Sequence, residues 1–514
     1  MNDVSRRTLL FGALGLAGVG AAAACSAGDP TVGGRTFGPI TASPGREVVD
    51  KTLTPRPTTL DLGGPTVSSW AYDADLPGPL IRATAGDLIR VRIINQLAAE
   101  TTVHWHGIAL RNDADGVPGM TQQAISPGAT YTYQFVAPDP GTYFYHPHVG
   151  VQLDRGLYGP LIIDDPHEPG GYDKEWVVVL DDWLDGTGTT PDDTLRKLLA
   201  SAGTTAPGGM NGMSGMSGMD PTALATPDTR NPGMPGMPGM PGMGGMGSSG
   251  PPFGDAGDVT YPYYLINGRL PAAPDVLAAR PGQRLRIRVI NAGADTIFKV
   301  ALGGHQLTVT HTDGWPVTPA QTEALYLGMG ERADLLITLA DGVFPLVAQP
   351  VGKQGHALAL IRTGAGSPPP SDVQPSELSG AALQAADLTP APTLHPSTKT
   401  PDAQADLTLT GQMSPYQWAI NGAPFGKNTP IPVSQGQRLR IRIRNQTMMA
   451  HPVHLHGHTF ALATSGLRKD TVMLRPMQAL DVDLDANNVG TWAAHCHNIY
   501  HAEAGMMIAL QYTA

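Results

Sequence analysis

The chain has 514 residues, of which 41 % are hydrophobic and only 15 % are charged, and it carries a formal net charge of −11. This length suffices for about three domains with cores of their own, and 63 glycines with 48 prolines favour short strands and tight turns over long surface helices. The acidic balance gives no reason to expect a nucleic-acid partner, and a total of two cysteines, Cys25 and Cys496, excludes a disulfide framework.

The first 25 residues have the features of an export signal. A Ser-Arg-Arg sequence at residues 5–7, followed by Leu9 and Leu10, resembles a twin-arginine signal, and the apolar run after it ends in small residues. This run is too short to favour a membrane span, and an N-terminal anchor helix is the alternative. We therefore predict a signal peptide over residues 1–25 and export by the twin-arginine route to the periplasm or cell envelope. The three residues directly before Cys25 are all alanine, which predicts either a lipid anchor at this cysteine or simple cleavage.

One pattern occurs three times along the chain. Residues 86–95, 282–291 and 436–445 each begin with glycine, alternate apolar residues with arginine, and end with asparagine. Alternation with a period of two is typical of a strand with one face in water, so three related β-domains are predicted. The predicted boundaries are 46–165 for the first domain, 172–364 for the second, 365–404 for a Pro-rich linker and 405–514 for the third.

Histidines occupy matching positions in the first and third domains. The positions nine and eleven residues after the asparagine hold histidine in both, and a second pair lies five and seven residues after a later glycine. The four pairs are His104/His106, His146/His148, His454/His456 and His495/His497. The corresponding positions of the second domain hold Val300, Leu302, Val347 and Gln349. We therefore expect metal where the first and third domains meet, with the second domain as a spacer and a candidate wall of the substrate site.

Eight such histidines exceed the needs of one metal ion. Alternate side chains of a strand face the same way, so both members of each pair can point into one site. Eight imidazoles match three metal ions, two with three ligands each and one with two, and imidazole suits copper. The remaining histidines are predicted to be structural or at the surface, with His458 the best candidate among them for a supporting contact: His167, His305, His311, His356, His395 and His458.

A second metal site is predicted around Cys496. Cys496, His501 and Met506 follow one another at steps of five residues, and a thiolate, an imidazole and a weak thioether are typical of a blue-copper site. His451 precedes His454 by an odd number of residues, so a strand would place it on the opposite face, as the second imidazole of this site. Cys496 lies between His495 and His497. On a strand, the cysteine would face one metal site and the two histidines the other, so one tripeptide would join the two sites.

The motifs HWHG, HPHVG, HPVHLHGH and HCHNIYHAEAGM, together with GERADLL at residues 330–336, resemble the copper motifs of the multicopper oxidases. The chain looks most similar to bacterial laccase-like oxidases of copper resistance, including envelope-anchored mycobacterial multicopper oxidases. The resemblance covers nearly the whole mature chain and implies an all-β protein of three consecutive cupredoxin-like Greek-key domains, each a β-sandwich or barrel. It also implies about four copper ions per chain, one of type I, one of type II and two of type III.

The same resemblance implies which residues bind each copper. The type I copper would be bound by His451, Cys496, His501 and Met506. The type II copper would be bound by His104 and His454. The two type III coppers would be bound by His106, His146 and His497 and by His148, His456 and His495.

The family mechanism implied by these motifs couples one-electron oxidation of a substrate at the blue copper to the four-electron reduction of dioxygen to water. Electrons would pass from Cys496 through His495 and His497 to the three-copper cluster. Asp115 matches an acidic residue that assists proton delivery in similar oxidases, although an aspartate before Gly116 is also a common turn residue.

A second acidic residue of the family is absent at its expected place. Ala502 stands there, directly after His501, and the nearest carboxylate is Glu503. On a strand, a shift of one residue turns a side chain to the other face, so a proton-relay role for Glu503 is not expected.

Residues 208–247 form an insert with two runs in which methionine recurs every third residue among glycines and prolines. Such a composition does not pack a core, and a thioether is a soft ligand suited to Cu(I). We interpret the insert as a copper-capturing segment, with a neutral linker as the alternative. Its methionines are Met210, Met213, Met216, Met219, Met234, Met237, Met240, Met243 and Met246. Met449, two residues before His451, matches a methionine of similar cuprous oxidases, whereas Thr447 replaces their aspartate.

The leading hypothesis is a monomeric envelope oxidase that uses dioxygen to convert Cu(I) to Cu(II) in copper tolerance, with activity on phenols or Fe(II). A laccase with a phenolic substrate and a ferroxidase are alternatives within the same chemistry. A copper-sequestering protein acting through the methionine insert is an alternative of a different class. A nitrite-reducing cupredoxin is disfavoured because it would leave the eight paired histidines without a role.

Overall fold

The computed structural model of the protein describes residues 31–32, 35–168, 170–200, 253–254, 257–395, 397 and 399–513. The predicted signal peptide with Cys25 and the methionine insert at 208–247 lie outside the described residues. Among the helices that are described, none is both long enough and apolar enough to cross a membrane.

The first domain consists of two sheets and a hairpin, and a short pair of strands precedes it. One sheet has the order β3 (Val48–Leu53), β7 (Leu88–Ile94), β9 (Thr130–Val136). The other has the order β6 (Ile81–Thr84), β11 (Gly159–Asp164), β10 (Gly141–His146), β8 (His104–His106). The hairpin consists of β4 (Pro55–Asp61) and β5 (Thr66–Tyr72), and the preceding pair of β1 (Thr31–Val32) and β2 (Arg35–Thr36).

The second domain has two six-stranded sheets. The first has the order β13 (Tyr263–Ile266), β12 (Lys174–Trp183), β15 (Arg284–Asn291), β20 (Arg332–Thr338), β17 (Leu307–Thr312), β18 (Trp315–Thr322). The second has the order β14 (Asp275–Ala278), β22 (Ala357–Arg362), β21 (Val343–Pro350), β16 (Phe298–Leu302), β19 (Ala324–Leu327), β23 (Ala382–Gln384). Helix α1 (Pro191–Ala200) follows β12 in the chain.

The third domain has one six-stranded and one five-stranded sheet. The first has the order β25 (Tyr416–Ile420), β24 (Ala403–Met413), β27 (Arg438–Asn445), β32 (Ala479–Asp485), β29 (Phe460–Leu462), β30 (Arg468–Lys469). The second has the order β26 (Ile431–Ser434), β34 (Met507–Thr513), β33 (Thr491–Cys496), β28 (His451–Leu455), β31 (Thr471–Leu474). Helix α2 (Ile499–Glu503) lies between β33 and β34.

All three domains repeat one topology. In each, the strand with the arginine pattern pairs in parallel with the first long strand of the domain, as β3/β7, β12/β15 and β24/β27. On the other sheet, the strand pairs β6/β11, β14/β22 and β26/β34 are also parallel. Parallel pairs require crossover connections, which separates this topology from a simple meander. The structure confirms the expectation of three consecutive all-β domains.

The asparagine that ends each arginine pattern makes the same hydrogen bonds in every domain. The side-chain amides of Asn95, Asn291 and Asn445 each donate to two main-chain carbonyl oxygens, over distances between 2.7 and 3.0 Å. Each side-chain oxygen accepts the amide of the residue two positions later at 3.0 Å. These bonds satisfy a buried amide and fix the loop that follows the strand. In the first and third domains, that loop leads to the histidine strands β8 and β28.

The arginine pattern predicted that one face of each of these strands is exposed to water, and this prediction is wrong for the second domain. Arg286 and Arg288 of β15 are buried there, because strand β10 of the first domain packs on that face of the sheet. Buried arginines require partners, and both guanidinium groups form ion pairs with Asp334. The Arg288 guanidinium also donates to the Thr142 hydroxyl of β10 at 2.8 Å. The pattern therefore predicted the strand correctly but not its burial against another domain.

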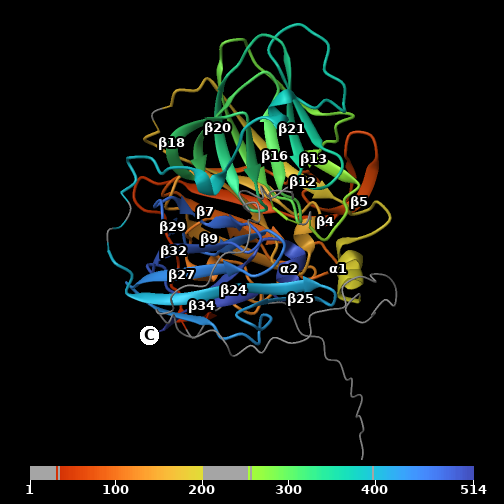
Figure 1. Cartoon of the computed structure of the whole chain (residues 1–514). Coiled ribbons are helices and arrows are strands. Elements are labelled where there is room, and N and C mark those ends of the chain that lie inside the picture. The colour runs from red at the N-terminus through yellow and green to blue at the C-terminus, as the bar shows by residue number, and fades with distance from the viewer. Residues whose placement is uncertain are drawn as a thin grey trace, which may run out of the picture.

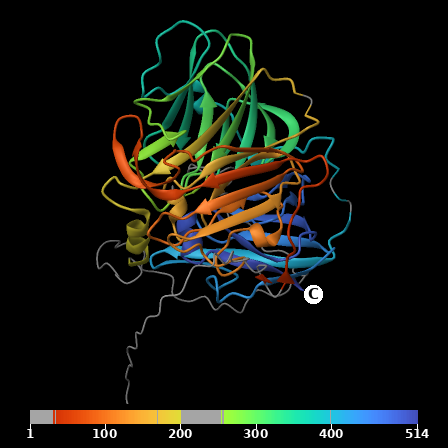
Figure 2. The same cartoon turned by 180° about the vertical axis from the view of Figure 1, so that it is seen from behind.

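The second domain, green in Figure 1, lies on one side of the first and third domains, which pack against each other. The view from behind shows the orange strands of the first domain beside the blue strands of the third (Figure 2). The stretch predicted as a linker, 365–404, contains β23, which pairs in parallel with β19 of the second domain. Much of this stretch is therefore part of the second domain's surface before the chain enters β24.

Candidate metal centre

The four histidine pairs meet between the first and third domains. His104 and His146 are register partners on β8 and β10, and His454 and His495 are register partners on β28 and β33. Alternation along each strand then brings the second member of each pair to the same region. All eight side chains are buried, and we refer to them as the eight-histidine cluster: His104, His106, His146, His148, His454, His456, His495 and His497.

In four rings of this cluster, the outward nitrogen has a carbonyl partner that fixes the tautomer of the ring. The Nδ1 atom of His104 lies 2.9 Å from the Asp115 carbonyl, and those of three further rings lie 2.8–3.0 Å from carbonyl oxygens: His146, His454 and His495. A carbonyl oxygen only accepts, so each Nδ1 carries the proton. The opposite nitrogen, Nε2, therefore keeps its lone pair for a metal ion.

The inward nitrogens converge without a protein donor between them. The Nε2 atoms of His456 and His495 are 3.0 Å apart, and those of His148 and His495 are 3.5 Å apart. Buried ring nitrogens without a hydrogen-bond partner are Nε2 of His104, His146 and His454, Nδ1 of His106, and both nitrogens of His497. Unpaired buried lone pairs are costly unless a ligand satisfies them. This donor set fits imidazole-bound metal ions such as copper.

Burial also keeps most of these imidazoles in the neutral form that binds metal. Desolvation, followed by repulsion from neighbouring rings, lowers the pKa of most cluster histidines below the ordinary value, and the pKa of His495 falls to about 3. The pKa is lowered in the same direction for His106, His146, His148, His454, His456 and His497. Metal binding at neutral pH therefore requires little deprotonation of the cluster.

Several subsets of the cluster have ligand atoms within 4.8 Å of one another. One subset, His148, His456 and His495, is the same as a predicted type III set. Two others combine His104 with His106 and His146, and His104 with His454 and His456. The predicted division of the eight rings among individual coppers is not tested by these groupings and stays a prediction.

A second group surrounds Cys496. Its Sγ atom lies 3.5 Å from Nδ1 of His451 and 3.6 Å from Nδ1 of His501, and the two Nδ1 atoms are 3.1 Å apart. All three side chains are fully buried, as is that of Met506, whose carbonyl accepts the Cys496 amide at 3.0 Å. We refer to these four residues as the cysteine site. A thiolate with two imidazoles fits copper.

Two residues hold the cysteine-site imidazoles from outside. The Thr447 hydroxyl lies 2.7 Å from Nε2 of His451. The Asp258 carboxylate lies 2.8 Å from Nε2 of His501, and it belongs to the segment that follows the methionine insert. Sequence reasoning missed Asp258, because 243 residues separate it from His501 and no local pattern marks it.

The strand expected around Cys496 ends at that residue. The following segment forms α2, whose N-terminus is capped by the Asn498 side chain, which accepts the amides of Tyr500 and His501. His501 therefore reaches the cysteine site from a helix. The prediction that Glu503 lies on a strand is wrong, because Glu503 is the last residue of α2. Its side chain is exposed there. Ala502 is buried.

Asp115 lies against the eight-histidine cluster. It follows the short 3-10 helix Asn112–Ala114 and is fully buried. Its carboxylate oxygens lie 3.1 Å from Nδ1 of His456 and 3.2 Å from Nδ1 of His104. Asp115 is thus a buried carboxylate in contact with two rings, one from each of the two domains that form the cluster.

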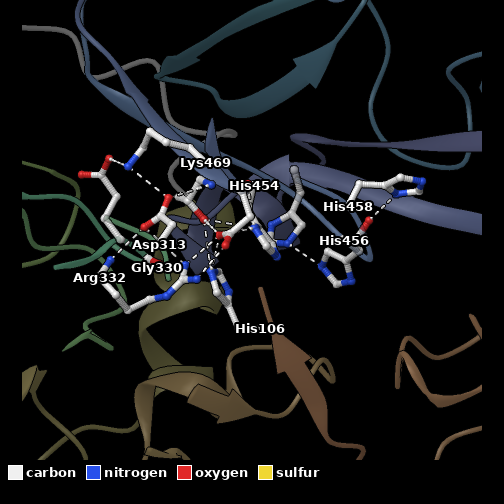
Figure 3. Close-up of polar contacts among 12 residues, drawn as sticks. His106, Asp313, Gly330, Arg332, His454, His456, His458 and Lys469 are labelled. Atoms are coloured by element: carbon white, nitrogen blue, oxygen red, sulfur yellow. Dashed lines mark hydrogen bonds and ion pairs between the residues drawn. The ribbon is translucent and has the colours of Figure 1, made fainter. Parts of the chain in front are cut away.

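Further supporting residues lie outside the cluster. His458 is buried, with Nδ1 3.0 Å from the His456 carbonyl and Nε2 2.7 Å from the Tyr512 hydroxyl, and burial lowers its pKa to about 4. Asp470, which sequence reasoning also missed, lies with Oδ1 3.3 Å from Nε2 of His106. Figure 3 shows His106 and His454 beside a group of buried charges that includes Arg332. The GERADLL motif contains Arg332, but its sequence did not indicate that this segment lies beside the histidines.

Comparisons with known proteins agree along most of the chain. Sequence models described as multicopper oxidase match residues 56–168, 174–366 and 398–514. The chain is 46 % identical over 468 residues to Multicopper oxidase MmcO of Mycobacterium tuberculosis, which covers 90 % of this chain and 87 % of that protein. It is 28 % identical to Copper resistance protein A of Escherichia coli over 98 % of each chain. The solved multicopper oxidase of Pseudomonas thermotolerans covers 91 % of this chain and 100 % of its own, with a TM-score of 0.67 at 25 % identity.

Proposed function

We propose a substrate and a role for this chain, which belongs to the multicopper oxidase family and is an oxidoreductase that uses oxygen. The proposed reducing substrate is Cu(I), and the proposed role is copper tolerance. Resident copper ions, when bound at the two histidine-rich sites, would supply one-electron transfer and the four-electron reduction of dioxygen to water. The similarity to proteins named for copper resistance supports this role.

The proposed ligands follow the resemblance described above. The cysteine site would hold one copper through His451, Cys496, His501 and Met506. The cluster would hold one copper through His104 and His454, and two more through His106, His146 and His497 and through His148, His456 and His495. The convergence of unpartnered ring nitrogens supports this proposal. Cys496 lies between His495 and His497 in the chain, so one tripeptide connects the two sites covalently.

The observation that carries Cu(I) as the substrate is a set of methionines next to the cysteine site. Met448 and Met477 are the most exposed large hydrophobic side chains among the described residues, at 66 % and 65 %. They belong to neighbouring segments, since the Met477 amide donates to the Thr447 carbonyl at 3.2 Å. Met449 is buried and lies between Met448 and His451 in the sequence. Thioethers are soft ligands that favour Cu(I) over harder cations.

A small cavity lies beside Met449 and Ala450, the two residues that directly precede His451 in the chain. Met449, Met329, Asp295 and Asn498 line it, and its volume of about 10 Å³ admits a small ion but not an aromatic ring. Gly254 forms a β-bridge with Met449, so the chain leaving the insert runs beside this cavity.

A second candidate substrate is a phenol, as in a laccase. Trp418 packs its ring 4.0 Å from the His501 ring, centroid to centroid. It also lines a larger hollow of about 460 Å³ together with Pro424 and Ala504. An aromatic ring held in that hollow would lie next to the residue that contacts His501.

Replacing the surface methionines separates these two substrates. We expect the variant Met448→Leu/Met449→Leu/Met477→Leu to raise KM for chelator-buffered Cu(I) by about tenfold or more, equivalent to about 1.4 kcal/mol. The KM for a phenol should not change, because leucine keeps the volume of methionine and the phenol does not need the sulfur. Steady-state oxygen uptake with each substrate measures both values.

Met120→Leu is the matched control, because Met120 lies half-buried in the first domain, away from the cysteine site. It should leave both KM values at the wild-type level. An unchanged KM for Cu(I) in the triple variant would refute Cu(I) entry at these methionines and would favour the phenol at Trp418.

Three further predictions concern residues or properties outside the described structure. Twin-arginine export to the periplasm or envelope, a lipid anchor at Cys25, and copper capture by the methionine insert all stay predictions. The monomeric state also stays a prediction.

A further inference from the structure

The second domain contacts the eight-histidine cluster although it contributes no histidine to it. Gly330 has a φ of +81°, and a Cβ atom there would lie 2.9 Å from Cε1 of His106 and from Cδ2 of His497. Its main chain therefore lies directly against two rings of the cluster, which requires glycine at this position. Gly330 opens a loop that continues into β20, where Arg332 is the first residue.

Arg332 and Asp470 form a bidentate ion pair between the second and third domains. Nη1 and Nη2 donate to Oδ1 and Oδ2 at 2.7 and 2.6 Å, and both side chains are fully buried. The guanidinium also donates through Nε to the Thr142 carbonyl at 3.0 Å and through Nη1 to the Gly330 carbonyl at 2.9 Å. Because Thr142 belongs to the first domain, Arg332 joins all three domains through one planar group.

Asp470 and the next residue hold the outward side of two cluster histidines. Oδ1 of Asp470 lies 3.3 Å from Nε2 of His106, and the Asp470 carbonyl lies 3.0 Å from Nδ1 of His454. The Thr471 hydroxyl lies 3.1 Å from the same His106 nitrogen and 3.0 Å from the same His454 nitrogen. Nδ1 of His106 and Nε2 of His454 are left buried and without a protein partner, on the inward side.

A second ion network fixes the residue before Asp470. Nζ of Lys469 lies 3.0 Å from Asp313 and 3.2 Å from Glu331, both in the second domain, and donates to the Thr312 hydroxyl at 2.9 Å. Figure 3 shows Lys469, Asp313 and Arg332 grouped on the side of His106 and His454. Asp313 also pairs with Arg332 at 3.5 Å, so the two networks are joined, and together they bind two consecutive residues of the third domain to the second domain.

We propose that Arg332 and Asp470 are positioning residues through which the second domain orients His106 and His454 for metal. This inference rests on the proposed function, because it requires that the cluster binds metal. A carboxylate on the outward nitrogen of a ligand histidine fixes its tautomer and ring angle and raises its basicity. The planar fork of Arg332 holds both oxygens of that carboxylate, and lysine offers no such fork.

A purely structural role predicts a different result from the same substitution. A buried ion pair is weak evidence for stability by itself, but breaking one leaves an unpaired charge and destabilises the fold. A structural role therefore lowers the melting temperature without changing the affinity of the folded protein for cluster metal. A positioning role changes that affinity while the cysteine site stays occupied.

The test compares Arg332→Lys with Arg288→Lys in the full chain. Arg288 is a suitable control because it is buried, paired with Asp334 and bonded to the hydroxyl of Thr142, but it contacts no histidine among the described residues. Copper competition against a chelator measures cluster affinity, the blue absorption measures the cysteine site, and the type II electron paramagnetic resonance signal reports ring geometry. The melting temperature of the metal-free protein measures stability.

We expect Arg332→Lys to lower the affinity for cluster copper by about 10- to 100-fold and to change the type II signal, while the blue absorption is retained. Arg288→Lys should keep wild-type affinity and signal. Wild-type affinity and signal in Arg332→Lys, with a fall in melting temperature equal to that of Arg288→Lys, would overturn the inference.

Asp470→Asn is the second variant if Arg332→Lys does not fold. Asparagine keeps the size of aspartate but removes the negative charge, so the same selective loss of cluster copper is expected. Full retention of cluster affinity in Asp470→Asn would also overturn the inference. If the wild-type chain binds no cluster copper, the proposed function is overturned, and the inference with it. This outcome is distinguishable because it occurs in the unmodified protein, whereas failure of the inference alone appears only in the variants.

Discussion

Cys496→Ser is expected to abolish the blue absorption and to lower oxygen uptake with Cu(I) to the background rate. The Cys496 sulfur lies within 3.6 Å of the Nδ1 atoms of His451 and His501, and serine replaces a soft thiolate with a hard, protonated oxygen. The substitution also changes the residue that links His495 to His497. Absorption spectroscopy of the copper-loaded protein and an oxygen electrode measure the two effects.

The chain provides a control in its other cysteine. Cys25→Ser should retain the blue absorption and the wild-type rate of oxygen uptake, because Cys25 is predicted to belong to the export signal. The type II signal of the eight-histidine cluster should persist in Cys496→Ser, because the cluster's imidazoles remain. A blue Cys496→Ser protein, or one with unchanged oxygen uptake, would show that Cys496 is not the sulfur ligand.

Asp115→Asn is expected to lower kcat for dioxygen reduction by about 10²- to 10⁴-fold, the usual contribution of a positioned proton-transfer group. The Asp115 carboxylate is buried against Nδ1 of His456 and His104, and an amide of the same size cannot deliver or accept a proton there. The KM for Cu(I) should change little, because Asp115 is not among the residues beside the cysteine site. Steady-state oxygen uptake as a function of pH measures the effect.

Asp113→Asn is the matched control for this prediction. Asp113 is two residues away, nearly buried and paired with Arg111, but its carboxylate has no contact with the cluster among the described residues. It should keep kcat and its pH profile near the wild-type values. A wild-type kcat in Asp115→Asn would leave Asp115 with the role of a turn residue and a hydrogen-bond partner.

The sequence predicted the all-β fold and the meeting of the histidine pairs because both depend on local spacing. Histidines two residues apart share a face of a strand, and equal offsets after Asn95 and Asn445 place them on equivalent strands of two domains. The register that sets His104 opposite His146 did not follow from spacing. Strand pairing between distant segments depends on the packing of whole sheets, which no single motif contains.

The residues that support the histidines were the least predictable part of the site. Asp258 and Asp470 reach His501 and His106 through contacts between domains, so neither carries a pattern in its own segment. The burial of Arg286 likewise depends on the first domain covering β15. The helix at His501 was missed because its capping residue, Asn498, comes only two residues after the end of β33, and the histidine spacing indicated a strand there.

The ratio of Cu(I) oxidised to dioxygen consumed tests the proposed function most directly. The copper-loaded protein is mixed with chelator-buffered Cu(I), and the formation of Cu(II), the uptake of oxygen and the appearance of hydrogen peroxide are recorded together. The proposed function predicts fast, saturable oxidation of about four Cu(I) per dioxygen without hydrogen peroxide, since reduction to water takes four electrons. Rapid oxygen uptake with a phenol but none with Cu(I), or about two Cu(I) per dioxygen with accumulation of peroxide, would contradict it.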